Sequence, residues 1–109
     1  MTETSEITAL AVVNSFDGHE EECLRLLREF YALLRRKHYS RDLLYRDQKD
    51  PGRFVNLRYW RSAEAAAEAQ EDPDVHRFWK RLSEIAEVTG VFERLEDVTP
   101  QDSTTKQQG

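Results

Sequence analysis

Apolar residues follow a strand pattern along four stretches of this chain and recur at helical spacing along two others. Residues 39–46, 53–60 and 87–96 alternate in the manner of β-strands, and residues 7–15 are largely apolar on both faces, which is typical of a central strand. The segments 23–34 and 75–85 repeat apolar side chains every three or four positions, which is typical of amphipathic helices. The pattern therefore predicts the element order β-α-β-β-α-β.

The first helix is bounded by its charged residues. Asp17 followed by Glu20 forms a capping-box pattern, so we expect a helix over about Gly18 to Lys37. Acidic residues open this helix and basic residues close it, as the helix dipole favours. Cys23 falls on the apolar side of the helix, which predicts a buried and unreactive thiol.

The second helical region is divided in two. Ser62 is an N-cap for a short alanine-rich helix, Ala63 to about Gln70, and Asp72 with Pro73 at the first helical position starts another. We expect Trp79, on the apolar side of that second helix, to lie in the core.

The last strand, Glu87 to Glu96, contains a glycine at its centre. Strict alternation would place Val88 and Phe92 on one face and Val91 and Leu95 on the other. Gly90 indicates a bulge or a close backbone approach.

Right-handed connections fold this order into a ferredoxin-like split β-α-β domain of the α+β class, a four-stranded antiparallel sheet with helices on one face. Residues 39–46 and 53–60 form a hairpin around Pro51-Gly52, with 39–46 at an edge and 7–15 central. The strands carry apolar residues on both faces, but helices can cover only one. We therefore expect a homodimer, formed through the open sheet face.

Length and composition limit the class of protein. The chain has 109 residues and one cysteine, and its formal net charge is -5. We expect a flexible segment at 1–6, one domain at 7–97 and a disordered tail at 98–109. The acidic balance argues against a nucleic-acid partner, and no apolar run is long enough for a membrane span. The polar start without a signal-peptide pattern and the single cysteine predict a cytoplasmic protein.

The candidate chemistry lies on the strand at 53–60. Asn56 and Trp60 are four residues apart and therefore share a sheet face with Arg58. An amide and an indole on one face can hydrogen-bond and stack on a small molecule. The commoner alternative is a structural role, in which Asn56 and Trp60 bond to each other or to the backbone of a central strand. His19 and Cys23 imitate a zinc-protease spacing but have no third ligand, so we predict no metal site.

Several motifs together resemble the antibiotic biosynthesis monooxygenase family of dimeric α/β barrels over about Ile7 to Asp97. They are the Asp17-Gly18 turn, the hairpin from Arg46-Asp47 to Asp50-Pro51, the segment Tyr59-Trp60-Arg61-Ser62-Ala63-Glu64-Ala65, and Asp72-Pro73-Asp74-Val75-His76-Arg77-Phe78. Their order and spacing are characteristic of the fold more than of one reaction.

The resemblance implies a cofactor-independent monooxygenase that oxidises an electron-rich aromatic molecule, such as a quinol or anthrone, with O2. Family enzymes of this kind place an Asn and a Trp four apart on this strand, so Asn56 and Trp60 are the expected catalytic residues. The family also uses a Tyr and an Arg on the following helices. The tyrosine position falls near Ala66 here, and only Lys80 or Arg81 lies near the arginine position. Asn14, His76, Lys80 and Arg81 are the expected substrate-binding residues.

Two other interpretations stay open. Haem-degrading relatives need an Asn at the end of the first strand, which Asn14 matches, but their Trp position falls near Ala69 and Lys80 is closer than His76 to the axial-ligand position. The second interpretation is a dimeric barrel without turnover that binds a small apolar ligand or a protein partner.

Overall fold

A computed structural model gives the fold of residues 6–100, which are the residues described below. The element order is β1 (Ile7–Ser15), α1 (Glu20–Arg36), β2 (Ser40–Arg46), β3 (Arg53–Trp60), α2 (Ala63–Glu71), α3 (Pro73–Ile85) and β4 (Ala86–Leu95). The predicted flexible 1–6 segment and 98–109 tail fall mostly outside the described residues.

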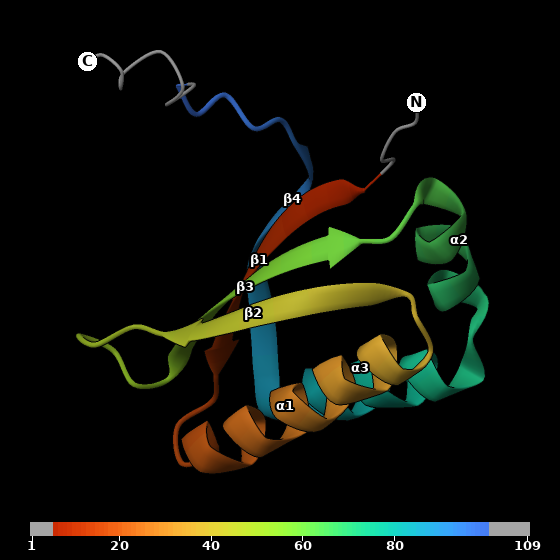
Figure 1. Cartoon of the computed structure of the whole chain (residues 1–109). Helices are drawn as coiled ribbons and strands as arrows, with labels where there is room; N and C mark the ends of the chain where they lie inside the picture. The colour runs from red at the N-terminus through yellow and green to blue at the C-terminus, as the bar shows by residue number, and fades with distance from the viewer. Residues whose placement is uncertain (1–5, 101–109) are drawn as a thin grey trace.

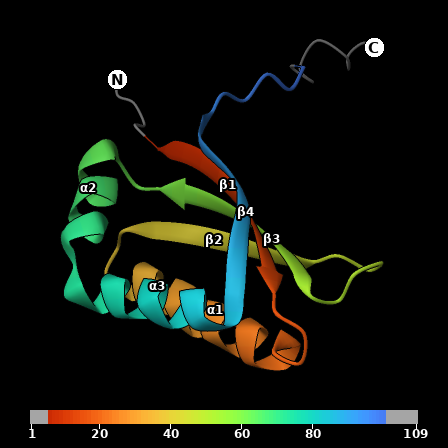
Figure 2. The ribbon, with the colours of Figure 1, turned by 180° about the vertical axis from the view of Figure 1, so that it is seen from behind.

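The four strands form one antiparallel sheet in the order β2-β3-β1-β4. This is the predicted ferredoxin-like α+β fold, with β1 central and β2 at an edge. Helices α1 and α3 run along one face of the sheet, α2 lies at the end of β3, and the other face is open (Figures 1 and 2). No helix within residues 6–100 is long and apolar enough to span a membrane.

Two apolar clusters join the helices to the sheet. One is built around Leu27, Phe54 and Leu82, and the other around Phe30, Leu34 and Val75. Cys23 is fully buried in the first cluster, as its place on the helix predicted.

The helix ends follow the predicted caps with one exception. The Ser62 hydroxyl accepts from the Ala65 N–H, and the Asp72 carboxylate accepts from the Asp74 N–H, so both predicted N-caps are confirmed. The predicted Asp17 cap is wrong, because Gly18 adopts a left-handed conformation with φ of 85° and moves the helix start to Glu20. His19 is then the N-cap, and its side chain does not accept a hydrogen bond from the backbone of the first helical turn.

The last strand corrects the predicted faces. Val12 pairs with Gly90 but Val13 pairs with Val88, so Thr89 is an extra residue and the bulge expected near Gly90 is confirmed. Because the extra residue reverses the alternation, Phe92 pairs with Leu10 on the open face, opposite to the face of Val88.

Trp79 is 42 % exposed, with its ring in a T-shaped arrangement against Phe30, so its predicted core position is also wrong.

Candidate active site

Strand β3 turns every second side chain toward the helices, and these four share one face as the period of two predicted: Phe54, Asn56, Arg58 and Trp60. Asn56 is 2 % exposed and Arg58 is 7 % exposed. A buried amide and a buried guanidinium need partners, because an unpaired polar group in the interior costs free energy.

Asp42 on the neighbouring strand supplies those partners. Its side chain is 1 % exposed and lies directly opposite Arg58 in the β2–β3 register. Arg58 Nε donates to Asp42 Oδ2 at 2.5 Å, and Asn56 Nδ2 donates to the same oxygen at 3.0 Å. Ser40 Oγ donates to the other oxygen, Oδ1, at 2.8 Å. We call Ser40, Asp42, Asn56 and Arg58 the Asp42 cluster.

Aromatic rings surround the charged end of Arg58. Its guanidinium carbon lies 5.0 Å from the centre of the Trp60 ring, 5.2 Å from that of Tyr31 and 5.6 Å from that of Phe30. The electron-rich faces of these rings attract the cation where water cannot reach it. The Asp42 cluster is therefore a buried ion pair with apolar walls.

The amide of Asn56 is fully engaged as a donor. Beyond its bond to Asp42, Nδ2 donates to the backbone carbonyl of Leu43 at 3.2 Å. In this arrangement Asn56 orients Asp42 and ties β3 to β2. Direct donation from Asn56 to a bound oxyanion stays a prediction, since it requires one of these two bonds to open.

A cavity of about 400 Å³ lies between α1 and β2 and reaches the cluster through Asp42. Tyr31, Asp42 and Leu43 are among its lining residues, whereas Asn56 and Trp60 are not. Burial raises the pKa of the Tyr31 phenol, an effect that the Arg58 charge opposes only in part, so Tyr31 is a hydrogen-bond donor at neutral pH. Tyr31 and Asp42 thus both line this cavity, and the Asp42 side chain itself is 1 % exposed.

The predicted substrate-binding residues lie elsewhere. Asn14 is on the open face, where its amide donates to Thr89 Oγ1 at 2.6 Å and accepts from Arg53 Nε at 3.2 Å. The sheet therefore separates Asn14 from Asn56.

The three predicted residues of α3 are exposed. His76 Nε2 contacts the carbonyl of Gln70, and Arg81 pairs with Glu22 and Glu84. Lys80 is likewise on the solvent side of the helix. The structure does not bring these three residues to the Asp42 cluster, and their role in binding stays a prediction.

The zinc-like spacing in α1 has a structural explanation. His19 Nδ1 pairs with Glu22 at 3.0 Å, and Cys23 points into the core, where burial raises the pKa of its thiol to about 11. Across residues 6–100 no group of three or more His, Cys, Asp or Glu side chains is arranged to hold a metal ion.

Sequence reasoning missed Asp42 and Tyr31 as site residues. A signal for Asp42 was present, because Arg58 on an inward-facing position requires a buried counter-ion. The hairpin makes β2 the nearest source, and Asp42 is the acidic residue of β2. Tyr31 carried no such signal, since aromatic residues on a helix are usually part of the core.

The chain resembles known proteins in both sequence profile and fold. The profile of the family described as antibiotic biosynthesis monooxygenase matches residues 7–81. SnoaB, a cofactor-independent oxygenase from Streptomyces nogalater, is 18 % identical, with a TM-score of 0.74 over 88 % of this chain and 99 % of that one. PA3566 from Pseudomonas aeruginosa is 23 % identical, with a TM-score of 0.72 over 88 % of this chain and 100 % of that one. At these identities the likeness concerns the fold. The search of curated proteins gave no significant match.

Proposed function

The chain belongs to the antibiotic biosynthesis monooxygenase family, and on that premise we propose that it is a cofactor-independent monooxygenase that oxidises an electron-rich aromatic ring with O2. The observation that carries the proposal is the Asp42 cluster, a buried ion pair beside a cavity of about 400 Å³ that Asp42 lines. Volumes of this order are typical of small-molecule sites. A quinol or an anthrone is the substrate class that this chemistry suits.

The proposed reaction begins with loss of a proton from the substrate. Asp42 Oδ1 accepts one hydrogen bond, from Ser40, and an ionised carboxylate oxygen has room for a second. In the proposed complex a substrate hydroxyl in the cavity reaches this oxygen and gives its proton to Asp42. The Tyr31 hydroxyl, which lines the same cavity, then donates to the substrate anion, and Arg58, which does not line the cavity, stabilises the anion through its charge.

The electron-rich anion supplies the electrons for oxygen. It transfers one electron to O2, and the resulting radicals combine into a peroxide on carbon. For an anthrone, the methylene carbon gains one oxygen atom as a carbonyl, and the second oxygen leaves as water with the two methylene hydrogens. Trp60 and Phe30 do not line the cavity, but their rings lie against the Arg58 guanidinium behind Asp42 and keep the dielectric low around the ion pair.

Oxygen uptake with an anthrone or hydroquinone, measured under air and under argon, tests the proposal. We expect Asp42→Asn to lower the rate by about 10²–10⁴-fold, the usual worth of a general base. Trp60→Phe lowers it as well, and Trp79→Phe, the same change on the exposed face of α3, leaves it unaltered. Circular dichroism confirms that each variant is folded.

Equal rates in the wild type and in folded Asp42→Asn would refute the proposed enzyme. Tight binding of the same aromatic molecules without any oxygen uptake would instead support a dimeric barrel that binds ligands without turnover.

We also propose that the chain forms a homodimer through the open sheet face. This face carries the apolar side chains Leu10, Val12, Val55 and Leu57 on the central strands, with exposed Phe92 beside them. An apolar surface of this kind is rarely left to water, and the same face of a second copy covers it with a two-fold arrangement.

Light scattering tests the dimer. We expect a mass of twice the 12.8 kDa of the chain, and a monomer for Leu57→Asp, which places a charge at the centre of the open face. Ala67→Asp, the matched change on the exposed side of α2, keeps the dimer. A wild-type monomer at micromolar concentration contradicts the proposal.

A further inference from the structure

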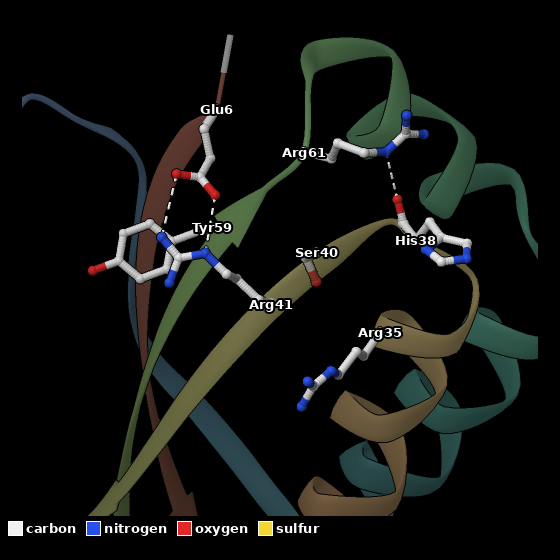
Figure 3. Close-up of a pocket in the computed structure, with 7 residues that line it drawn as sticks. All are labelled: Glu6, Arg35, His38, Ser40, Arg41, Tyr59 and Arg61. Carbon is white, nitrogen blue, oxygen red and sulfur yellow. Dashed lines mark hydrogen bonds and ion pairs between the residues drawn. The ribbon is translucent and has the colours of Figure 1, made fainter. Parts of the chain in front are cut away.

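A second cavity, of about 310 Å³, lies where the C-terminal end of α1 meets the start of β2 (Figure 3). Its lining includes three arginines from three different segments: Arg35 from α1, Arg41 from β2 and Arg61 from the turn after β3. Glu6 and Tyr59 complete the side near the sheet. The first cavity shares Arg35 and Arg41 with it, so the two are neighbours along the edge of β2.

Local structure explains why one of the three arginines stands at its position. Arg35 stands in the last turn of α1, where the helix dipole favours a cation. Arg41 and Arg61 lie outside any helix, so the dipole gives no reason for them. Their position at one cavity is a product of the tertiary structure.

Two of the arginines are held in place. Arg41 donates to Glu6 from Nε at 3.1 Å and from Nη2 at 3.3 Å, and its guanidinium carbon lies 4.0 Å above the Tyr59 ring. Arg61 donates from Nε to the carbonyl of His38 at 2.6 Å. His38 has a φ of 62°, the left-handed conformation common just after a helix, which turns its carbonyl toward Arg61.

The cavity carries a surplus of positive charge. Three guanidinium groups and one carboxylate, that of Glu6, line it, in a chain whose formal net charge is -5. The Arg35 side chain makes no hydrogen bond or ion pair within residues 6–100, and the Nη atoms of Arg61 are not used by its bond to His38. Donors with fork geometry are therefore available for an incoming group.

We propose that this cavity binds the oxyanion of a small acid, a carboxylate or a phosphate. Guanidinium groups match both, because two parallel N–H donors meet two oxygens. Arg35 and Arg61 supply these donors, and the Arg41–Glu6 pair lines the site on the side of Tyr59. The volume suits a small molecule. The proposal is independent of the proposed oxidation, since it concerns binding alone.

Calorimetric titration with benzoate, benzamide and inorganic phosphate tests this site. Benzamide has the shape of benzoate without its charge, so we expect benzoate to bind and benzamide to bind at least tenfold more weakly. Phosphate binding in addition to benzoate identifies a general oxyanion site, and benzoate binding alone identifies a carboxylate site. In both cases added salt weakens binding.

Two variants and one control locate the site. Arg35→Gln and Arg61→Gln each weaken benzoate binding by about tenfold, the loss expected for a charged hydrogen bond. Arg36→Gln removes a neighbouring charge from α1 that does not line the cavity and leaves binding unaltered. Arg35→Gln breaks no side-chain hydrogen bond or ion pair within the described residues. Its effect on binding therefore does not depend on the conformation of the turn around His38 and Arg61.

The proposal is overturned if neither anion binds in the millimolar range, if benzamide binds as well as benzoate, or if Arg36→Gln weakens binding as much as Arg35→Gln. Arg35 also lines the first cavity, so the Arg61→Gln result, at a residue of the second cavity alone, is the one that separates this proposal from the proposed oxidation.

Discussion

Removing the charge of Arg58 should destabilise this protein more than any surface substitution of the same kind. Arg58→Met keeps most of the length and apolar character of the side chain but leaves Asp42 without its cationic partner. The Asp42 side chain is 1 % exposed, and only Ser40 and Asn56 then remain to solvate its charge. Breaking a buried pair from one side strands a charge that water cannot reach.

The expected loss is about 3–5 kcal/mol of the free energy of unfolding. A domain of this size has a total of about 5–15 kcal/mol, so the variant should lie near the limit of folding. Urea denaturation followed by tryptophan fluorescence measures the difference, and Trp60, 5.0 Å from the guanidinium carbon, reports directly on the cluster.

Arg53→Met is the matched control. Arg53 is on the same strand but on the open face, where its side chain is 47 % exposed and pairs with Asp47 at 3.3 Å. An exposed ion pair of this kind contributes about 0–1 kcal/mol. The second control is Asp42→Leu combined with Arg58→Met. Because it removes both charges, it should be more stable than Arg58→Met alone by more than about 1 kcal/mol.

If Arg58→Met and Arg53→Met lowered the free energy of unfolding equally, the Asp42–Arg58 pair would be solvated in solution. The Asp42 cluster could then not act as the low-dielectric site on which the proposed oxidation depends.

Two further predictions concern single titratable groups. Cys23 is fully buried and the pKa of its thiol is raised to about 11. Iodoacetamide at about pH 8 should therefore label it only after denaturation, which mass spectrometry measures. Labelling of the native protein would contradict the structure. Donation from Lys37 and Tyr39 lowers the pKa of the Asp72 carboxyl below its usual value. The stability that Asp72 contributes is therefore present above about pH 3.9 and is lost as the pH falls through the lowered pKa. The difference in urea midpoint between the wild type and Asp72→Asn should shrink from neutral pH to about pH 3, and a constant difference would refute this linkage.

The alternating pattern of β3 predicted the face of Asn56 but not its hydrogen-bond partners. Alternation along β3 correctly placed Asn56 and Trp60 on one face, because the direction of a strand side chain depends only on its position. It could not reveal that both N–H groups of Asn56 are used by Asp42 and the Leu43 carbonyl. Those partners belong to another strand, and their identity depends on the register of the hairpin.

The sequence by itself determined the order of the elements, the caps at Ser62 and Asp72 and the inward face of β3. The caps depend on contacts between residues two or three positions apart, and the strand face depends on the period of two. Both can be read from the sequence without knowing the rest of the fold. It also indicated the family, since the motif order is a property of the sequence alone.

Only the tertiary structure decided what those faces contain. The pairing of Asp42 with Arg58 and the meeting of Arg35, Arg41 and Arg61 join segments far apart in the sequence. The bulge at Thr89 moved Phe92 to the opposite face of the sheet. The physical reason is common to these cases: one residue of register reverses every side chain beyond it, and register is set by the packing of the whole sheet.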